Sequence, residues 1–221
     1  MAQLNAQLNA LPRARCVVLA SGRGSHFENF MRAYERGDFP GEIVAVVSDK
    51  PEAPVKAKAQ HYGVPFYSAS PKAFPSREAF DEALLTMIEP LSPDCVLLAG
   101  YMRKLSSEFL AGVDAPVLNI HPSLLPSFPG LHAQRQALEK GVRFTGATVH
   151  LVDAGLDSGP ILDQAICPVE LDDTEDTLSA RLLPIEHELY LSTLQTFLPT
   201  LMELKAGLLP ESFETPSTSE P

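Results

Sequence analysis

The chain has 221 residues, of which 45% are hydrophobic, and a formal net charge of −11 at pH 7. The length suits one α/β domain, and the acidic balance argues against a nucleic-acid partner, because phosphate backbones are bound chiefly by clustered Lys and Arg. No apolar run reaches the roughly 20 residues that cross a membrane, and the N-terminus lacks the basic start and apolar stretch of a secretory signal.

Short apolar runs alternate with helical stretches along the first half of the chain. Strands are predicted at 15–20, 42–49, 64–68, 93–100 and 115–121, and helices after each of the first two strands and at 77–91 and 104–112. These strands are apolar without alternation, which is typical of a parallel sheet covered on both faces. Later, 146–153 and 159–169 are joined by so short a connection that only an antiparallel step is possible. The predicted fold is therefore Rossmann-like α/β: a mostly parallel twisted sheet, helices on both faces, and one antiparallel strand near an edge.

The rest of the chain completes the predicted organisation. A long helix is predicted over about 174–198, and a single domain over 15–200. A leader at 1–14 is predicted to be flexible, and a Pro- and Ser-rich acidic tail at 206–221 to be disordered. The odd number and wide separation of the cysteines argue against a disulfide framework or a zinc site and predict buried free thiols in a reducing cytoplasm. They are Cys16, Cys95 and Cys167.

The first strand ends in the loop SGRGSH, residues 21–26, which opens the first helix. Glycines let the backbone approach a ligand, and the free N–H groups of a helix N-terminus favour a phosphate. A dinucleotide fingerprint would need glycine where Phe27 stands, and no GxxxxGK[ST] sequence is present. A plain tight turn with Ser25 as the helix cap is the alternative, and the residues leave both open.

A polar pair interrupts the apolar strand 115–121. In a strand successive side chains point to opposite faces, so Asn119 and His121 share one face, and Pro122 ends the strand directly after them. An amide and an imidazole side by side supply two hydrogen-bond donors to a developing oxyanion. The alternative is that both are structural, as a turn-capping Asn and a satisfied His. Their pairing before a stiff, proline-rich loop favours function.

An acid for this pair lies in the turn DAGLDSGP. A carboxylate near His121 would favour its charged form and fix its orientation. Asp157 is the candidate, and Asp153 competes for the role. Turn chemistry by itself explains either residue.

Five segments in this order resemble the phosphoribosylglycinamide formyltransferase family, a branch of the folate-dependent formyltransferases, over about 15–200. They are SGRGSH, AGYMRKLS, NIHPSLLPSFPGLHAQRQAL, GATVHLVDAGLDSGPIL and IEHELYL. The resemblance implies formyl transfer from 10-formyltetrahydrofolate to the amine of glycinamide ribonucleotide, in purine synthesis. It implies small-molecule substrates, with no metal, nucleic acid or membrane as partner. It carries the catalytic roles onto Asn119, His121 and Asp157.

The same resemblance implies two sets of binding residues. The ribonucleotide phosphate and ribose are expected at Gly24, Ser25, His26 and Glu186. The folate is expected at Arg77, Met102, Arg103, Lys104, Leu105 and Asn119. One departure concerns His26, which stands where the family usually has Asn. Whether the protein is a monomer or a homodimer is left open.

Formyl transfer to a sugar nucleotide competes with this function, although PGLHAQ and the phosphate loop point away from it. Four further functions also compete. Methionyl-tRNA formyltransferase needs a basic surface for tRNA, which the acidic balance disfavours. Formyltetrahydrofolate hydrolase usually has an N-terminal regulatory domain, and only about 14 residues precede the first predicted strand. A non-catalytic nucleotide-binding module is a third reading. A metallohydrolase is the fourth, and its metal ligands would be His121, His132, His150 and Asp153. The spacing of these residues matches no short metal-binding motif.

Overall fold

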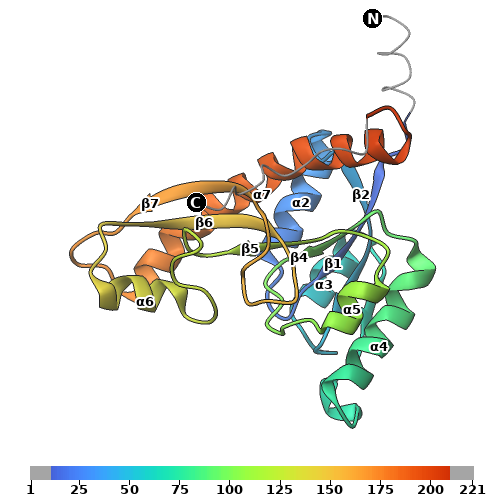
Figure 1. Ribbon diagram of the computed structural model, residues 1–221, viewed down its shortest axis with the longest axis horizontal. Helices are drawn as coiled ribbons and strands as arrows, with labels where there is room; N and C mark the ends of the chain where they lie inside the picture. Colours follow the sequence, from blue (N-terminus) through green and yellow to red (C-terminus); the bar gives the residue numbers. More distant parts are fainter. Residues whose placement is uncertain (1–10, 210–221) are drawn as a thin grey trace, which may run out of the picture.

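The computed structural model describes residues 11–209, which form one seven-stranded sheet in the order β3-β2-β1-β4-β5-β6-β7 (Figure 1). The strands are β1 (Ala14–Leu19), β2 (Gly41–Ser48), β3 (Phe66–Ser68), β4 (Cys95–Leu98), β5 (Val117–His121), β6 (Phe144–Leu151) and β7 (Ile161–Pro168). Most of the predicted leader, 1–14, and tail, 206–221, lie outside the described residues. No helix among 11–209 is long and apolar enough to cross a membrane.

The strand directions confirm the predicted fold class. Strands β1 to β5 are parallel, whereas β6 runs antiparallel to both β5 and β7. The single reversed strand is therefore the last but one at its end of the sheet. The order changes direction between β1 and β4, and in open α/β sheets ligands bind outside the carboxyl ends of the strands at such a switch point.

Helices surround the sheet, and the chain also forms two short 3₁₀ helices. They are α2 (Ser25–Arg36), α3 (Val55–His61), η1 (Pro71–Ala73), α4 (Arg77–Ile88), η2 (Glu89–Leu91), α5 (Ser107–Gly112), α6 (Ala133–Lys140) and α7 (Glu175–Lys205). One core cluster packs the sheet against α2, α3 and α7, and the other packs the opposite face against α4 and α5. Neighbouring residues of β1 divide between them: Val18 lies in the first cluster and Val17 in the second, both fully buried. Burial on both faces explains why the strands lack polar alternation.

Helix α7 is longer than predicted, because it continues past Pro199 to Lys205. Its start is fixed by a capping box in which the side chains of Thr174 and Thr177 bond each other's backbone N–H. At its end the Lys205 ammonium lies 2.6 Å from the Asp94 carboxylate, next to the start of β4. The buried Tyr190 hydroxyl donates to the Leu118 carbonyl at 3.1 Å, so α7 is anchored directly on β5.

Helix α6 was not predicted from the sequence. It has eight residues and buries only Ala133 and Ala137, too short a pattern for helical periodicity to reveal. His132 and Gly141 flank it with positive φ values of 59° and 63°. The helix is thus delimited by backbone turns rather than by an apolar stripe.

The cysteines agree with the prediction of buried free thiols. Cys16, Cys95 and Cys167 are free and buried. Burial raises the pKa of the Cys16 thiol to about 12, with a smaller contribution from the nearby Asp94 carboxylate. At neutral pH this thiol is therefore protonated and behaves as a small apolar side chain.

Candidate active site

A cavity of about 560 Å³ lies beside the carboxyl ends of β4 and β5. Residues 100–105, which follow β4, form one wall, and the Ser21 hydroxyl accepts the Met102 N–H at 2.9 Å to hold this segment beside the first loop. The end of β5, with residues 119–122, forms a second wall. The remaining walls come from 130–134, 150–157 and Glu175. The cavity therefore occupies the place where this sheet topology predicts a ligand.

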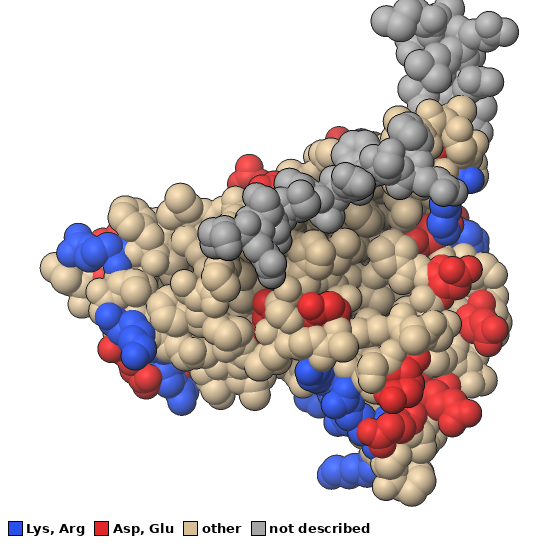
Figure 2. All heavy atoms as spheres, viewed as in Figure 1, with Lys and Arg blue, Asp and Glu red and all other residues tan. Residues whose placement is uncertain are grey.

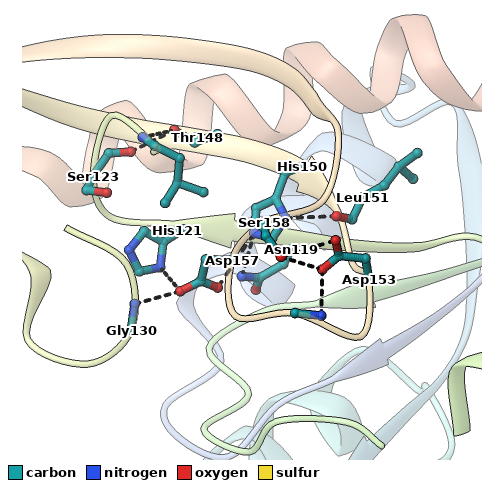
Figure 3. Close-up of polar contacts among 12 residues, drawn as sticks. Asn119, His121, Ser123, Gly130, Thr148, His150, Leu151, Asp153, Asp157 and Ser158 are labelled. Atoms are coloured by element: carbon teal, nitrogen blue, oxygen red, sulfur yellow. Dashed lines mark hydrogen bonds and ion pairs between the residues drawn. The ribbon is translucent and has the colours of Figure 1, made fainter. Parts of the chain in front are cut away.

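His121 lies on this cavity between two hydrogen-bond acceptors (Figure 3). Its Nδ1 is 3.3 Å from Oδ2 of Asp157, and its Nε2 is 2.9 Å from the carbonyl oxygen of Phe128. An imidazole donates from both nitrogens only when it carries both protons. The 5% exposed ring therefore faces one acceptor at each nitrogen, and these two contacts fix its orientation.

The acid beside His121 is Asp157, not Asp153. Besides its contact with His121, Oδ2 of Asp157 accepts the Gly130 N–H at 2.7 Å. Asp153 instead holds its own turn together, since its Oδ1 accepts the Gly155 N–H at 3.0 Å and the Ser158 hydroxyl at 2.9 Å. Asp157 has φ +50°, a conformation that costs non-glycine residues energy and is found preferentially at functional sites.

Asn119 makes its contact with a residue that sequence reasoning named only as a hypothetical metal ligand. Pairing of β5 with β6 places Asn119 opposite His150, and the Asn119 amide nitrogen lies 3.2 Å from Nε2 of that ring. Nδ1 of His150 donates to the Leu151 carbonyl at 2.9 Å, so Nε2 is free to accept. Burial lowers the pKa of His150, which keeps the ring neutral in this accepting form. One amide N–H of Asn119 is thereby engaged, and the second remains for a ligand.

The glycine loop and α7 together form a second group of candidate residues, outside the lining of the cavity. Nε2 of His26, on α2, lies 3.1 Å from Oε2 of Glu186, on α7, and their side chains are 7% and 12% exposed. Gly24, with φ +66° and no capping side chain, precedes α2. Ser25 is the first residue of the helix, so the alternative of a Ser25 cap is wrong.

Gly24 provides a test of this loop, because a Cβ there would fall 2.3 Å from Cγ2 of Val55, on α3. Gly24→Ala is expected to shift α2 relative to α3 and to raise the KM for a ligand held at the helix N-terminus, with some loss of stability. Gly22→Ala is the matched control, since nothing lies within 4 Å of a Cβ there. Steady-state kinetics and thermal unfolding of both variants measure the difference. Equal KM values for the two would contradict this role of the loop.

His187, whose ring packs against the ring of His26, predicts a pH dependence of stability. The pKa of His187 is lowered to about 4, first by burial and then by the neighbouring His26. Because the unfolded chain titrates near the usual value of about 6.5, it binds more protons than the folded one between these two values. The free energy of unfolding is therefore expected to fall by about 1–2 kcal/mol between pH 7 and pH 5 from this residue. In urea unfolding, His187→Gln should show a smaller fall of the unfolding free energy between pH 7 and pH 5. The control His61→Gln, at an exposed position, should show the full fall.

The predicted folate residues divide into two positions. Met102, Arg103, Lys104 and Leu105 line the cavity, with Met102 62% exposed and Leu105 only 3% exposed. Arg77 does not line it. It lies on α4, 3.9 Å from Oδ2 of Asp81, and that oxygen accepts the Ser106 N–H, so Arg77 is connected to the cavity wall indirectly. Figure 2 shows basic side chains gathered next to acidic ones beside α4.

The candidate metal ligands do not form a metal site. His132 pairs with Glu175, 3.3 Å from its Oε1, while Asp153 holds its own turn. Within residues 11–209 no group of three or more His, Cys, Asp or Glu side chains is arranged to hold a metal ion. The metallohydrolase reading therefore has no support from the geometry of these side chains.

Comparisons with known proteins show which family the chain resembles. The family model described as formyl transferase matches residues 14–194. Phosphoribosylglycinamide formyltransferase of Escherichia coli (strain K12) is 43% identical over 174 residues, which cover 79% of this chain and 82% of that protein.

Two solved structures show the same likeness in three dimensions. Glycinamide ribonucleotide transformylase 1 from Symbiobacterium toebii superposes with a TM-score of 0.82 at 43% identity, covering 85% of this chain and 89% of that one. Phosphoribosylglycinamide formyltransferase from Brucella melitensis gives a TM-score of 0.78 at 50% identity, covering 84% and 95%. With its fold, its strand-end polar pair and these relatives, the chain belongs to the phosphoribosylglycinamide formyltransferase family of formyl transferases.

Proposed function

We propose that this enzyme transfers the formyl group of 10-formyltetrahydrofolate to the amine of glycinamide ribonucleotide, a step of purine synthesis in the cytoplasm. The observation that carries the proposal is the convergence of Asn119, His121 and Asp157 on one cavity. Family membership supports the reaction class, and the cavity supports a small-molecule substrate. At about 560 Å³ the cavity falls within the usual range for ligand pockets, roughly 300–1,000 Å³.

The chemistry requires stabilisation of an oxyanion. The substrate amine attacks the formyl carbon, a C–N bond forms, and negative charge develops on the formyl oxygen. The free N–H of Asn119 and an N–H of His121 are the two donors for that oxygen, and they lie on one face of the same strand. Since Nε2 of His121 is bonded to the Phe128 carbonyl, the substrate oxygen must replace or share that acceptor.

Proton transfer follows from the position of Asp157. Its carboxylate lies 3.3 Å from Nδ1 of His121 and 3.8 Å from Nε2 of the neutral His150. It stabilises the positive charge of His121 during the attack and accepts the ammonium proton, directly or through one water. Collapse of the intermediate breaks the bond between the formyl carbon and N10 of the folate, which takes up the proton.

Binding of the two substrates is assigned to two neighbouring regions. The folate is placed in the cavity, between residues 102–105 and the apolar side chains of Leu131 and Leu156, which are 71% and 56% exposed. The ribonucleotide phosphate is placed at the N-terminus of α2, where the helix dipole favours an anion. The His26–Glu186 pair then offers a carboxylate oxygen to the ribose hydroxyls.

An assay with purified protein tests the proposal. Formylated glycinamide ribonucleotide and tetrahydrofolate should appear in equal amounts, and neither should form when one substrate is omitted. Formate released without the ribonucleotide would identify a hydrolase. Binding of a nucleotide without any turnover would identify a non-catalytic module, and either result would overturn the proposal.

A further inference from the structure

The loop 128–132 supplies backbone groups to both polar residues at the centre of the cavity. The Phe128 carbonyl accepts from Nε2 of His121 at 2.9 Å, and the Gly130 N–H donates to Asp157 at 2.7 Å. Figure 3 shows the His121 ring and the Gly130 N–H both directed at the same oxygen of Asp157. The orientation of His121 and Asp157 therefore depends on where this loop lies.

Three residues of this loop have a left-handed backbone conformation. Phe128, Gly130 and His132 have φ values of 57°, 80° and 59°. Glycine adopts this left-handed region readily, but other residues pay roughly 1–2 kcal/mol each. Such conformations persist only where the surrounding structure enforces them.

Two further contacts, made by side chains of α6 and α7, enforce this loop. The Gln136 side-chain amide, on α6, donates to the carbonyls of Pro129 and Leu131 at 3.0 and 3.1 Å, on either side of Gly130. In the first turn of α7, Glu175 lies 3.3 Å from Nδ1 of His132 and accepts from Arg135 at 2.9 Å. The first contact fixes the middle of the loop, and the second ties its end to α7.

We propose that Gln136 and Glu175 are positioning residues, which hold the loop 128–132 so that its backbone orients His121 and Asp157 for the reaction. The inference rests on the proposed formyl transfer and adds two residues to it. Neither residue needs to touch the reacting atoms. Their effect passes through the Phe128 carbonyl and the Gly130 N–H, so it acts on turnover more than on binding of the ribonucleotide.

Variants of Gln136 separate hydrogen bonding from shape. Gln136→Met and Gln136→Glu keep the length of the side chain but remove its donors, and both are expected to lower kcat by about 10-fold, as small displacements of catalytic groups do. The KM for the ribonucleotide should stay within about 2-fold of the wild-type value, because these variants leave the contacts that bind the substrate unchanged. Gln136→Lys, which restores a donor, should recover much of kcat. Glu139→Gln, an exposed position of the same helix, is the matched control and should behave as wild type.

A second measurement reports the mechanism rather than the rate. In ¹⁵N NMR of the imidazole, Gln136→Met should change the Nε2 signal of His121, and Glu175→Gln should change it less. Wild-type kcat in both Gln136→Met and Gln136→Glu would overturn the proposal, as would a lowered melting temperature with unchanged kcat and an unchanged His121 signal. Failure of the proposed function has a different signature, since the wild-type enzyme itself would then form no formylated ribonucleotide.

Discussion

His121→Ala is expected to lower kcat for formyl transfer by at least about 10²-fold, the scale for loss of one oxyanion donor. In the proposed mechanism this residue supplies an N–H to the reacting oxygen and, beside Asp157, a positive charge. Its removal also takes a hydrogen-bond donor from the Phe128 carbonyl and leaves the Asp157 carboxylate with the Gly130 N–H. Asn119→Ala is expected to have an effect of similar size, because it removes the second donor and frees Nε2 of His150.

Single-turnover kinetics with saturating substrates give the cleanest measurement, since they separate chemistry from product release. Thermal unfolding checks that the fold persists. His61→Ala is the control, as this histidine is exposed on α3 and away from the cavity lining. A His121→Ala enzyme with more than about a tenth of the wild-type kcat would contradict the assignment of an oxyanion donor to this residue.

Asp157→Asn is expected to remove most of the activity, while Asp153→Asn leaves most of it. Asp157 contacts His121, whereas Asp153 contacts only its own turn. Asn is the informative replacement at residue 157, because it tolerates the positive φ of 50° that Ala does not. The change therefore removes the negative charge and leaves the backbone in place.

The two aspartate variants form a matched pair, since both keep the size of the side chain and lie in one turn. Dissociation constants for a folate analogue and for the ribonucleotide should change little in Asp157→Asn, so its loss appears in kcat. The reverse ranking, with Asp153→Asn the more damaging change, would show that the carboxylate was assigned to the wrong residue.

The sequence by itself determined the class of fold and the strand-end pair. Apolar runs without alternation predicted burial on both faces of a parallel sheet, and alternation within β5 put Asn119 and His121 on one face. Both inferences are local, since they depend only on the two-residue period of a strand and on the residues beside it.

Contacts between distant segments had to come from the tertiary structure. Asp153 and Asp157 are equivalent candidates in the sequence, and only the path of the turn after β6 brings Asp157 to His121. The pairing of β5 with β6 revealed His150, and the docking of α6 on the loop before it revealed Gln136. These contacts arise from packing between elements many residues apart, which no local periodicity encodes, whereas side-chain alternation is a property of each strand alone.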